Sequence, residues 1–214
     1  MNEEKAKIKV RRAFSVTEVL NAKFNELDFD GEWLKAIGRP EKTGTWIISG
    51  PTKNGKTTFC MMLAKYLTKF DRVYYNSVEE GLSKSMQTAY KRVGMKEVKG
   101  KVLMEKESLE EMEARLEAHK SPGFVFVDSI QFLNIKQDEY KALKEKFKNK
   151  IIIYISHVKG RQMDGEVAQF IMRDANVVIR VEGRRAFIET RYEGDGYIDV
   201  HKEYADRYWL GQSK

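Results

Sequence analysis

The sequence predicts a single α/β domain, with a mostly parallel central sheet flanked by helices and a C-terminal antiparallel meander. Three observations predict this fold class. Short apolar runs of strand length alternate with longer segments of helical periodicity between residues 45 and 155. A glycine-rich loop joins the first apolar run to a helix, and three β-rich runs separated by turn residues follow residue 175. A chain of 214 residues is long enough for one such domain with a substantial core.

The composition is that of a soluble globular protein, with 33% charged and 42% hydrophobic residues. The longest apolar runs, such as residues 151–155, are far shorter than a membrane span, and the first residues contain no apolar signal core. We therefore expect a cytoplasmic protein without a membrane partner. Cys60 is the only cysteine, which excludes an internal disulfide and a multi-cysteine zinc site. The net charge of +7 allows a polyanionic partner, although solvated lysine-rich helices would give the same balance.

The N-terminal region is predicted to lie outside the main domain. Residues 1–23 are expected to form a basic arm and a short helix, whose start is marked by the capping-box spacing of Ser15 and Glu18. The main domain is expected over residues 24–203, and residues 204–214 are expected to be a tail that folds back or docks on a partner. Residues 24–38 are interpreted as a lid beside the site that the glycine-rich loop forms, with core packing favoured for Trp33.

The glycine-rich loop has the spacing of a phosphate-binding loop. It follows a predicted strand at residues 45–49 and precedes a predicted helix at residues 57–70. Two glycines enclose four residues and are followed by a lysine and a hydroxyl residue. The loop consists of Gly50, Pro51, Thr52, Lys53, Asn54, Gly55, Lys56, Thr57 and Thr58. An ordinary strand-to-helix turn is the alternative, but the complete pattern in this setting favours a nucleotide site.

Each part of this pattern has a physical reason. A loop wrapped around a polyphosphate brings successive backbone N–H groups to the anion, and Gly50 and Gly55 allow conformations and close approaches that a Cβ would obstruct. The helix that begins near Lys56 directs its positive end at the phosphates, and the lysine adds a mobile cation. Thr57 offers a hydroxyl to Mg²⁺. The expected cofactors are therefore ATP and Mg²⁺.

Two carboxylates follow the next β-rich run, residues 72–78. Glu79 and Glu80 are poorly suited to a core, but ligands of parallel α/β sheets bind at the C-terminal ends of the strands. Both acids are therefore expected at the ligand crevice. A helix at residues 81–93, a strand at residues 101–104 and a further helix continue the alternation.

Asp128 ends the continuous apolar run at residues 124–127 and is the expected metal partner. A carboxylate at the end of a buried strand, downstream of a phosphate-binding loop, holds Mg²⁺ or its water in ATPases with such a loop. An aspartate that caps the next turn is the alternative. With Thr57, Asp128 makes up the predicted metal site.

A strongly basic helix and another buried strand come next. Residues 138–150 are interpreted as an amphipathic outer helix with a solvated lysine face, and a nucleic-acid surface is the alternative. The strand at residues 151–155 ends at Ser156 and His157. We interpret His157 as a sensor of the γ-phosphate, the alternative being a histidine that is simply hydrogen-bonded at a strand end.

The polar loop at residues 158–167 is the candidate nucleic-acid contact. Lys159 and Arg161 are suited to phosphate contacts with a nucleic-acid backbone, and a solvated connection is the alternative. The three strands of the predicted meander are residues 176–181, 186–191 and 197–200, with turns at 183–184 and 193–196. The meander is expected to close the sheet.

The motifs resemble a known family when they are taken in order. They are residues 50–58, 77–80, 127–131, 156–159 and 191–192. In this order they resemble the RecA-like ATPase core, closest to RadA and the DnaB-type helicases, over roughly residues 24–200. The chain has neither the zinc module and protease-like domain that flank the core in RadA nor the helical domain of replicative helicases. It therefore resembles the short RecA-core proteins of phages and mobile elements that are associated with single-strand annealing or recombination.

This resemblance implies roles for particular side chains. Glu79 looks like the catalytic glutamate that polarises the attacking water, with Glu80 as its possible substitute. Asp128 resembles the Mg²⁺-associated aspartate. His157 occupies the place of the polar residue that links the γ-phosphate to the following DNA-binding loop.

Arg191 resembles an arginine that reaches across a subunit boundary to stabilise transferred charge. Many relatives carry a lysine two residues earlier, where this chain has Glu189. A role for Arg191 in a neighbouring site implies self-association as a hexamer, ring or filament.

The leading functional hypothesis is an ATPase that acts on single-stranded DNA in recombination, annealing or replication, with hydrolysis stimulated by the DNA. Two alternatives stay open at this point. One is a hexameric helicase motor or accessory, and the other is a nucleotide-dependent regulatory switch that binds a protein partner. The sequence also leaves open whether the nucleic acid is DNA or RNA.

Overall fold

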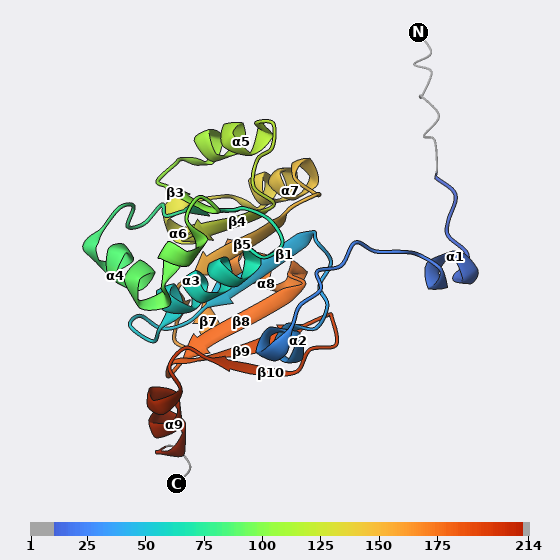
Figure 1. The fold of residues 1–214 in the computed structure, drawn as a ribbon. Coiled ribbons are helices and arrows are strands. Elements are labelled where there is room, and N and C mark those ends of the chain that lie inside the picture. The colour runs from blue at the N-terminus through green and yellow to red at the C-terminus, as the bar shows by residue number, and fades with distance from the viewer. Residues whose placement is uncertain (1–10, 212–214) are drawn as a thin grey trace.

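The central sheet has the strand order β10-β9-β8-β1-β5-β4-β2-β3 (Figure 1). The computed structural model describes residues 11–211, and within them this sheet contains eight strands. Their bounds are β1 Gly44–Ser49, β2 Val73–Asn76, β3 Val102–Glu105, β4 Phe124–Asp128, β5 Ile151–Ser156, β8 Val177–Glu182, β9 Arg185–Thr190 and β10 Gly196–Asp199. Neighbouring strands run parallel from β3 to β8, and β9 and β10 continue antiparallel. The predicted mostly parallel sheet and its C-terminal meander are both confirmed.

β1 lies in the interior of the sheet, so the loop that follows it is held from two sides. The register places Ile48 of β1 between Ile155 of β5 and Ile179 of β8. All three side chains are buried. Central parallel strands are covered on both faces, which explains why β1 and β5 are continuous apolar runs and show no alternation.

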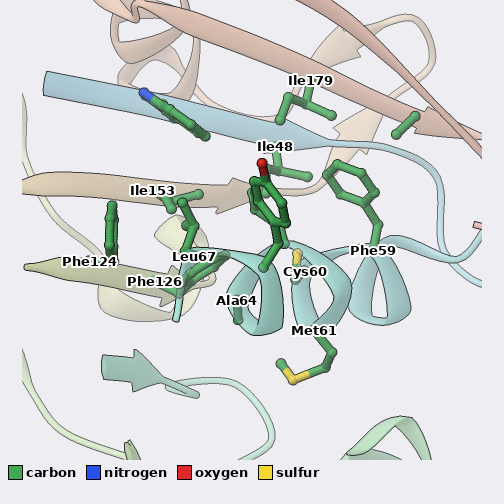
Figure 2. Close-up of a cluster of buried hydrophobic side chains, with 14 of the residues drawn as sticks. Ile48, Phe59, Cys60, Met61, Ala64, Leu67, Phe124, Phe126, Ile153 and Ile179 are labelled. Atoms are coloured by element: carbon green, nitrogen blue, oxygen red, sulfur yellow. The ribbon is translucent and has the colours of Figure 1, made fainter. Parts of the chain in front are cut away.

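Helices cover both faces of the sheet. The first face carries α2 Gly31–Ile37, α3 Lys56–Leu67, α4 Lys84–Val93 and the 3₁₀ helix η1 Met95–Val98. The second carries α5 Leu109–Glu117, α6 Ile130–Leu133, α7 Gln137–Lys146 and α8 Glu166–Asp174. Figure 2 shows the first core, where Phe59, Cys60 and Leu67 of α3 pack with Ile48, Ile153 and Ile179 of the sheet. This packing fixes the helix that follows the glycine-rich loop.

The N-terminal helix α1, Val16–Leu20, begins at the predicted capping box. Ser15 Oγ accepts a hydrogen bond from the Glu18 amide, and the Ser15 amide donates to Glu18 Oε2 at 2.8 Å. No residue of α1 is buried, and the helix lies apart from the sheet (Figure 1). Residues 1–10 of the predicted arm and 212–214 of the predicted tail lie outside the described residues.

The segment before β1 contributes to the core. Leu27, Phe29 and Trp33 are buried. The Trp33 ring stacks on Tyr66 of α3 with a centroid distance of 4.8 Å. The expected core packing of Trp33 is confirmed.

Residues 204–210 of the predicted tail lie in helix α9, Lys202–Leu210, which folds back on β9. Arg185 of β9 pairs with Asp199 at 2.6 Å and with Asp206 of α9 at 3.1 Å. The Trp209 ring meets Phe187 edge to face at 4.9 Å. These contacts show that the tail folds back on its own chain, which is one of the two outcomes expected for it.

Some features differ from the sequence-based expectation. Helix α8 was not predicted, and the loop at residues 158–167 contains a short hairpin of β6 Val158–Lys159 and β7 Gln162–Met163. Lys150 was expected on a solvated face but is buried, because α7 ends earlier and the side chain turns inward before β5. Its Nζ donates to Ser121 Oγ at 2.7 Å and to Pro122 O at 3.0 Å. Within the described range, none of the helices combines the length and apolarity that a membrane crossing requires.

Candidate nucleotide-binding site

A cleft of about 450 Å³ lies at the C-terminal ends of β1, β2, β4 and β5. It is lined by the phosphate-binding loop and the start of α3, and by four residues that were predicted to work with them: Glu79, Glu80, Asp128 and His157. These residues come from four separate stretches of the sequence. The fold therefore brings the loop and the predicted acids and histidine to one place.

Both glycines of the loop are required by its geometry. Gly50 has φ +157°, and a Cβ there would lie 2.0 Å from the backbone oxygen of Val181. Gly55 has φ +104° and precedes the first residue of α3. Lys56 Nζ reaches back to the Gly50 oxygen at 3.1 Å. The lysine is thus held over the loop whose amides would face a phosphate.

The loop is also anchored by the turn between β8 and β9, a contact that sequence reasoning missed. The Gly183 amide donates to Asn54 Oδ1 at 2.8 Å, and the Arg184 amide donates to the Asn54 oxygen at 3.2 Å. Because β8 pairs directly with β1, this turn lies beside the loop although about 130 residues separate them in sequence. No local pattern in the sequence indicates this contact.

Glu79 and His157 meet inside the cleft. Glu79 Oε2 lies 2.9 Å from His157 Nε2 and accepts a hydrogen bond from Ser129 Oγ at 3.3 Å. Glu80 instead accepts from the hydroxyls of Ser83, at 2.9 Å, and Ser85. Of the two carboxylates, Glu79 is therefore the one in contact with the predicted sensor.

Asp128 is partly buried at the end of β4 and accepts a hydrogen bond from the Tyr75 hydroxyl at 2.5 Å. Burial raises the pKa of the Asp128 carboxyl above its ordinary value, and the charge of Glu79 also raises it. A carboxylate whose charged form is disfavoured by burial and by a neighbouring carboxylate is a setting that a divalent cation stabilises. With the Thr57 hydroxyl in the same cleft, the oxygen donors fit Mg²⁺, which binds through few protein ligands together with phosphates.

The cleft is rich in cations, and several of them were not predicted. Lys84 and Arg92 of α4 and Arg184 of the β8–β9 turn line it beside Lys53 and Lys56. Within residues 11–211, none of these five side chains forms an ion pair with a carboxylate. Unpaired cations gathered in a concave site favour an anionic ligand. This charge pattern fits a polyphosphate.

Hydrogen bonds link the cleft to the β6–β7 hairpin. The His157 amide donates to Gln131 Oε1 at 3.2 Å, and Gln131 Nε2 donates to the Asp164 oxygen at 2.7 Å. The Asp164 amide in turn donates to the His157 oxygen at 3.0 Å. Lys159 and Arg161 lie exposed in this hairpin. The candidate DNA-contacting residues are thus joined to the residue that touches Glu79.

Arg191 lies outside the cleft. β9 runs antiparallel to β8, and Thr190 pairs with Val177 at the beginning of β8. The following Arg191 is therefore at the opposite edge of the sheet, where it lines a separate pocket with Arg39. Within this chain it is not part of the site, so its predicted role depends on a second subunit.

The comparisons with solved structures agree with this architecture. The flagellar accessory protein FlaH from Methanocaldococcus jannaschii matches with a TM-score of 0.56 and 18% identity, over 83% of this chain and 92% of that chain. A KaiC-like protein from Pyrococcus horikoshii matches with a TM-score of 0.54 and 16% identity, over 74% and 84%. A third solved structure, of an ATPase domain, matches with a TM-score of 0.52 and 15% identity, over 77% and 84%.

The chain has the RecA-like fold. No family model matches the sequence, and a search of curated proteins finds no match. The RecA-like fold is therefore established by its three-dimensional arrangement at identities below 20%, and the chain spans most of each matched structure. This fold accounts for the position of the phosphate-binding loop after a central strand and for the position of the acids at the ends of neighbouring strands.

Proposed function

We propose that this protein is an ATPase that binds single-stranded DNA and couples ATP hydrolysis to the position of its β6–β7 hairpin. One observation carries the proposal. Glu79, to which we assign the attacking water, contacts His157, and His157 begins the segment that forms the hairpin. His157 therefore connects the site that would hydrolyse ATP with the hairpin that would bind DNA.

The chemistry follows from the side chains in the cleft. The loop amides and Lys56 bind and orient the β- and γ-phosphates. Thr57 and Asp128 would hold Mg²⁺, which supplies positive charge to the phosphate oxygens. Glu79 orients the attacking water and accepts its proton. Arg92 and Arg184, which have no carboxylate partner among the described residues, neutralise charge on the phosphates.

The coupling follows from the hydrogen bonds around His157. A change in the Glu79–His157 contact when the γ-phosphate leaves would be passed through Gln131 to Asp164, which lies beyond the second strand of the hairpin. Lys159 and Arg161 would then change their positions relative to a bound phosphate backbone. Binding through these cations is sequence-independent, as phosphate contacts are in general.

The decisive experiment measures ATP hydrolysis with and without single-stranded DNA, for the wild-type protein and for Lys56→Ala. We expect DNA to stimulate hydrolysis and Lys56→Ala to abolish it. DNA binding should also weaken steeply with salt, because each neutralised phosphate releases counterions. Equal turnover with and without DNA would contradict the coupling.

The same preparations test the remaining hypotheses. Strand displacement by a ring-shaped particle would favour a helicase motor or its accessory. Tight ATP binding without turnover and without retention on DNA would favour a regulatory switch with a protein partner. Sizing with a nonhydrolysable ATP analogue tests self-association, which we propose because Arg191 can reach a nucleotide only in another subunit.

A further inference from the structure

A second pocket adjoins the nucleotide cleft. It has a volume of about 320 Å³ and shares Thr58, Arg92 and Arg184 with the cleft. Its other lining residues are Val200, His201 and Tyr204, from the end of the sheet and from the beginning of α9. The two hollows therefore form one continuous surface. In the sequence these last residues fall at the end of the predicted domain and in the predicted tail, and the site described above does not use them.

The pocket lies at the end of the cleft that the nucleoside would occupy. In the proposed function Glu79 and His157 lie at the terminal phosphate, and neither of them lines this pocket. Thr58 lies one residue beyond the metal-binding Thr57 on the first turn of α3, and it accepts a hydrogen bond from Arg92 Nη1 at 3.0 Å. A triphosphate whose last phosphate lies at Glu79 therefore points its organic end past Thr58.

The chemistry of the pocket suits a flat heteroaromatic ring. The His201 and Tyr204 rings are in contact, with a centroid distance of 4.6 Å and an interplanar angle of 74°. The Arg207 guanidinium lies over the Tyr204 ring, 4.9 Å from its centroid, and Tyr204 is still 55% exposed, so part of its surface can receive a ligand. Aromatic and guanidinium planes are the groups on which nucleobases stack. None of the residues that line this pocket is acidic, so it does not repel a nucleotide.

The pocket and the phosphate-binding loop are held together by one residue. The Arg184 amide donates to the Asn54 oxygen at 3.2 Å, and the Arg184 oxygen accepts from the Val200 amide at 2.8 Å. Gly55 packs against both segments, since a Cβ there would lie 3.2 Å from Arg184 Cδ and 3.3 Å from Val200 Cγ1. A fixed distance between the phosphate site and the aromatic pair is what a site for a complete nucleotide needs.

We propose that this pocket binds the nucleobase and ribose of the nucleotide, with Tyr204 of α9 and its N-cap residue His201 as the residues that contact the base. The inference rests on the proposed function, because it assumes that the cleft binds a nucleoside triphosphate. It makes α9 part of the nucleotide site.

The test separates the base from the phosphates by using two probes, ATP and inorganic tripolyphosphate, each with Mg²⁺. Dissociation constants are measured by titration calorimetry for the wild-type protein, Tyr204→Ala, His201→Ala and Tyr204→Phe. Leu210→Ala is the matched control, because Leu210 is an exposed residue of the same helix that does not line the pocket. Base stacking on an aromatic ring corresponds to roughly 5- to 150-fold in affinity by alanine substitution.

We expect Tyr204→Ala to weaken ATP binding about tenfold, towards the lower part of that range because the ring is half exposed. His201→Ala should weaken it less, and Tyr204→Phe and Leu210→Ala should leave it within about twofold. Tripolyphosphate affinity should stay the same in all four variants. The wild type should prefer ATP to CTP, since a purine offers more stacking area, and Tyr204→Ala should reduce that preference.

Two results would overturn the proposal. One is an unchanged ATP affinity in Tyr204→Ala. The other is an equal loss of ATP and tripolyphosphate binding in Tyr204→Ala while Tyr204→Phe retains both, which would mean that the ring supports the phosphate site and does not contact the base. Failure of the proposed function itself looks different: neither probe would bind the wild-type protein, or Lys56→Ala would leave both affinities unchanged.

Discussion

Replacing Glu79 by glutamine removes a base and a negative charge while keeping the shape of the side chain. The amide can still hydrogen-bond to His157 and to Ser129, which lie 2.9 and 3.3 Å from Glu79 Oε2. The fold and the phosphate-binding loop should therefore be unaffected. Any loss of activity then reports on the chemical step.

The size of the effect follows from the role. A positioned general base contributes about 10²–10⁴-fold to a rate, which is about 2.7–5.4 kcal/mol in activation free energy. We expect the hydrolysis rate of Glu79→Gln to fall by this factor. ATP affinity should stay within about twofold or improve slightly, because the variant has one negative charge fewer near the γ-phosphate.

The assay is phosphate release in a single turnover, together with calorimetric titration of ATP. Glu80→Gln is the matched comparison, since Glu80 is the adjacent carboxylate of the same cleft but is hydrogen-bonded to Ser83 and Ser85. We expect it to lose less than about threefold in rate. If Glu79→Gln kept more than a third of the wild-type rate, or if Glu80→Gln lost as much, the assignment of the base would be refuted.

Three further predictions concern stability, DNA binding and the loop. Glu107 accepts hydrogen bonds from Arg115 Nε at 2.9 Å, and Arg115 lowers the pKa of Glu107 below its ordinary value of 4.5. Because glutamine removes the charge from this pair, Glu107→Gln should lower the free energy of unfolding by about 1–2 kcal/mol at pH 7. This contribution is complete above about pH 4.5 and is lost as the pH falls through the lower folded-state pKa, so wild type and variant should converge in acid. Replacing Lys159 and Arg161 together by alanine should weaken single-stranded DNA binding and reduce the slope of log K against log salt by about 1.4. Gly50→Ala should abolish ATP binding, because its Cβ would lie 2.0 Å from a backbone oxygen and would displace the loop.

Each of these predictions has a control in the same chain. Equal unfolding free energies at pH 7, or a difference between wild type and Glu107→Gln that persists in acid, would contradict the ion-pair argument. Alanine at Lys141 and Lys148, two exposed lysines of the α7 region, should leave DNA binding unchanged; an equal loss there would mean that net charge alone controls it. Gly100→Ala, at a glycine with no neighbour within 4 Å, should retain ATP binding.

The parts of the site that could be predicted from sequence depend on local patterns at strand ends. The phosphate-binding loop, Glu79, Asp128 and His157 each follow a short apolar run, and parallel strands bring such ends to one edge. The fold class could be predicted for the same reason. The mostly parallel sheet and the meander follow from the order and spacing of those runs.

The parts that were missed depend on contacts distant in sequence. Arg184 enters the cleft because β8 pairs with β1, and Arg92 enters because α4 packs along α3. A single sequence carries no signal for either contact. Helix α8 did have a signal, since its buried residues Ala168 and Ile171 are spaced as on one face of a helix, but the polar loop predicted at residues 158–167 overlaps its start, and no element was predicted over the rest.

The expected lid beside the nucleotide site is wrong as a description of residues 24–38. None of these residues lines the cleft, and Leu27, Phe29 and Trp33 belong to the main core. The physical reason is their apolar character: these side chains lose more by remaining in solvent than a mobile segment could gain over a polar cleft. A sequence pattern of apolar residues among acids and glycines does not distinguish a lid from a segment that packs in the core.

The strand order has a consequence for how this protein is made. β1 pairs with β5, more than 100 residues later, and with β8, later still, so both of its neighbours leave the ribosome long after β1 itself. Contacts of such long sequence separation form late, because the loop-closure entropy must be overcome before they contribute. Gly50 and Asn54 acquire their contacts with β8 and its turn only at that stage. A nascent chain therefore contains the whole phosphate-binding motif long before it contains a phosphate-binding site.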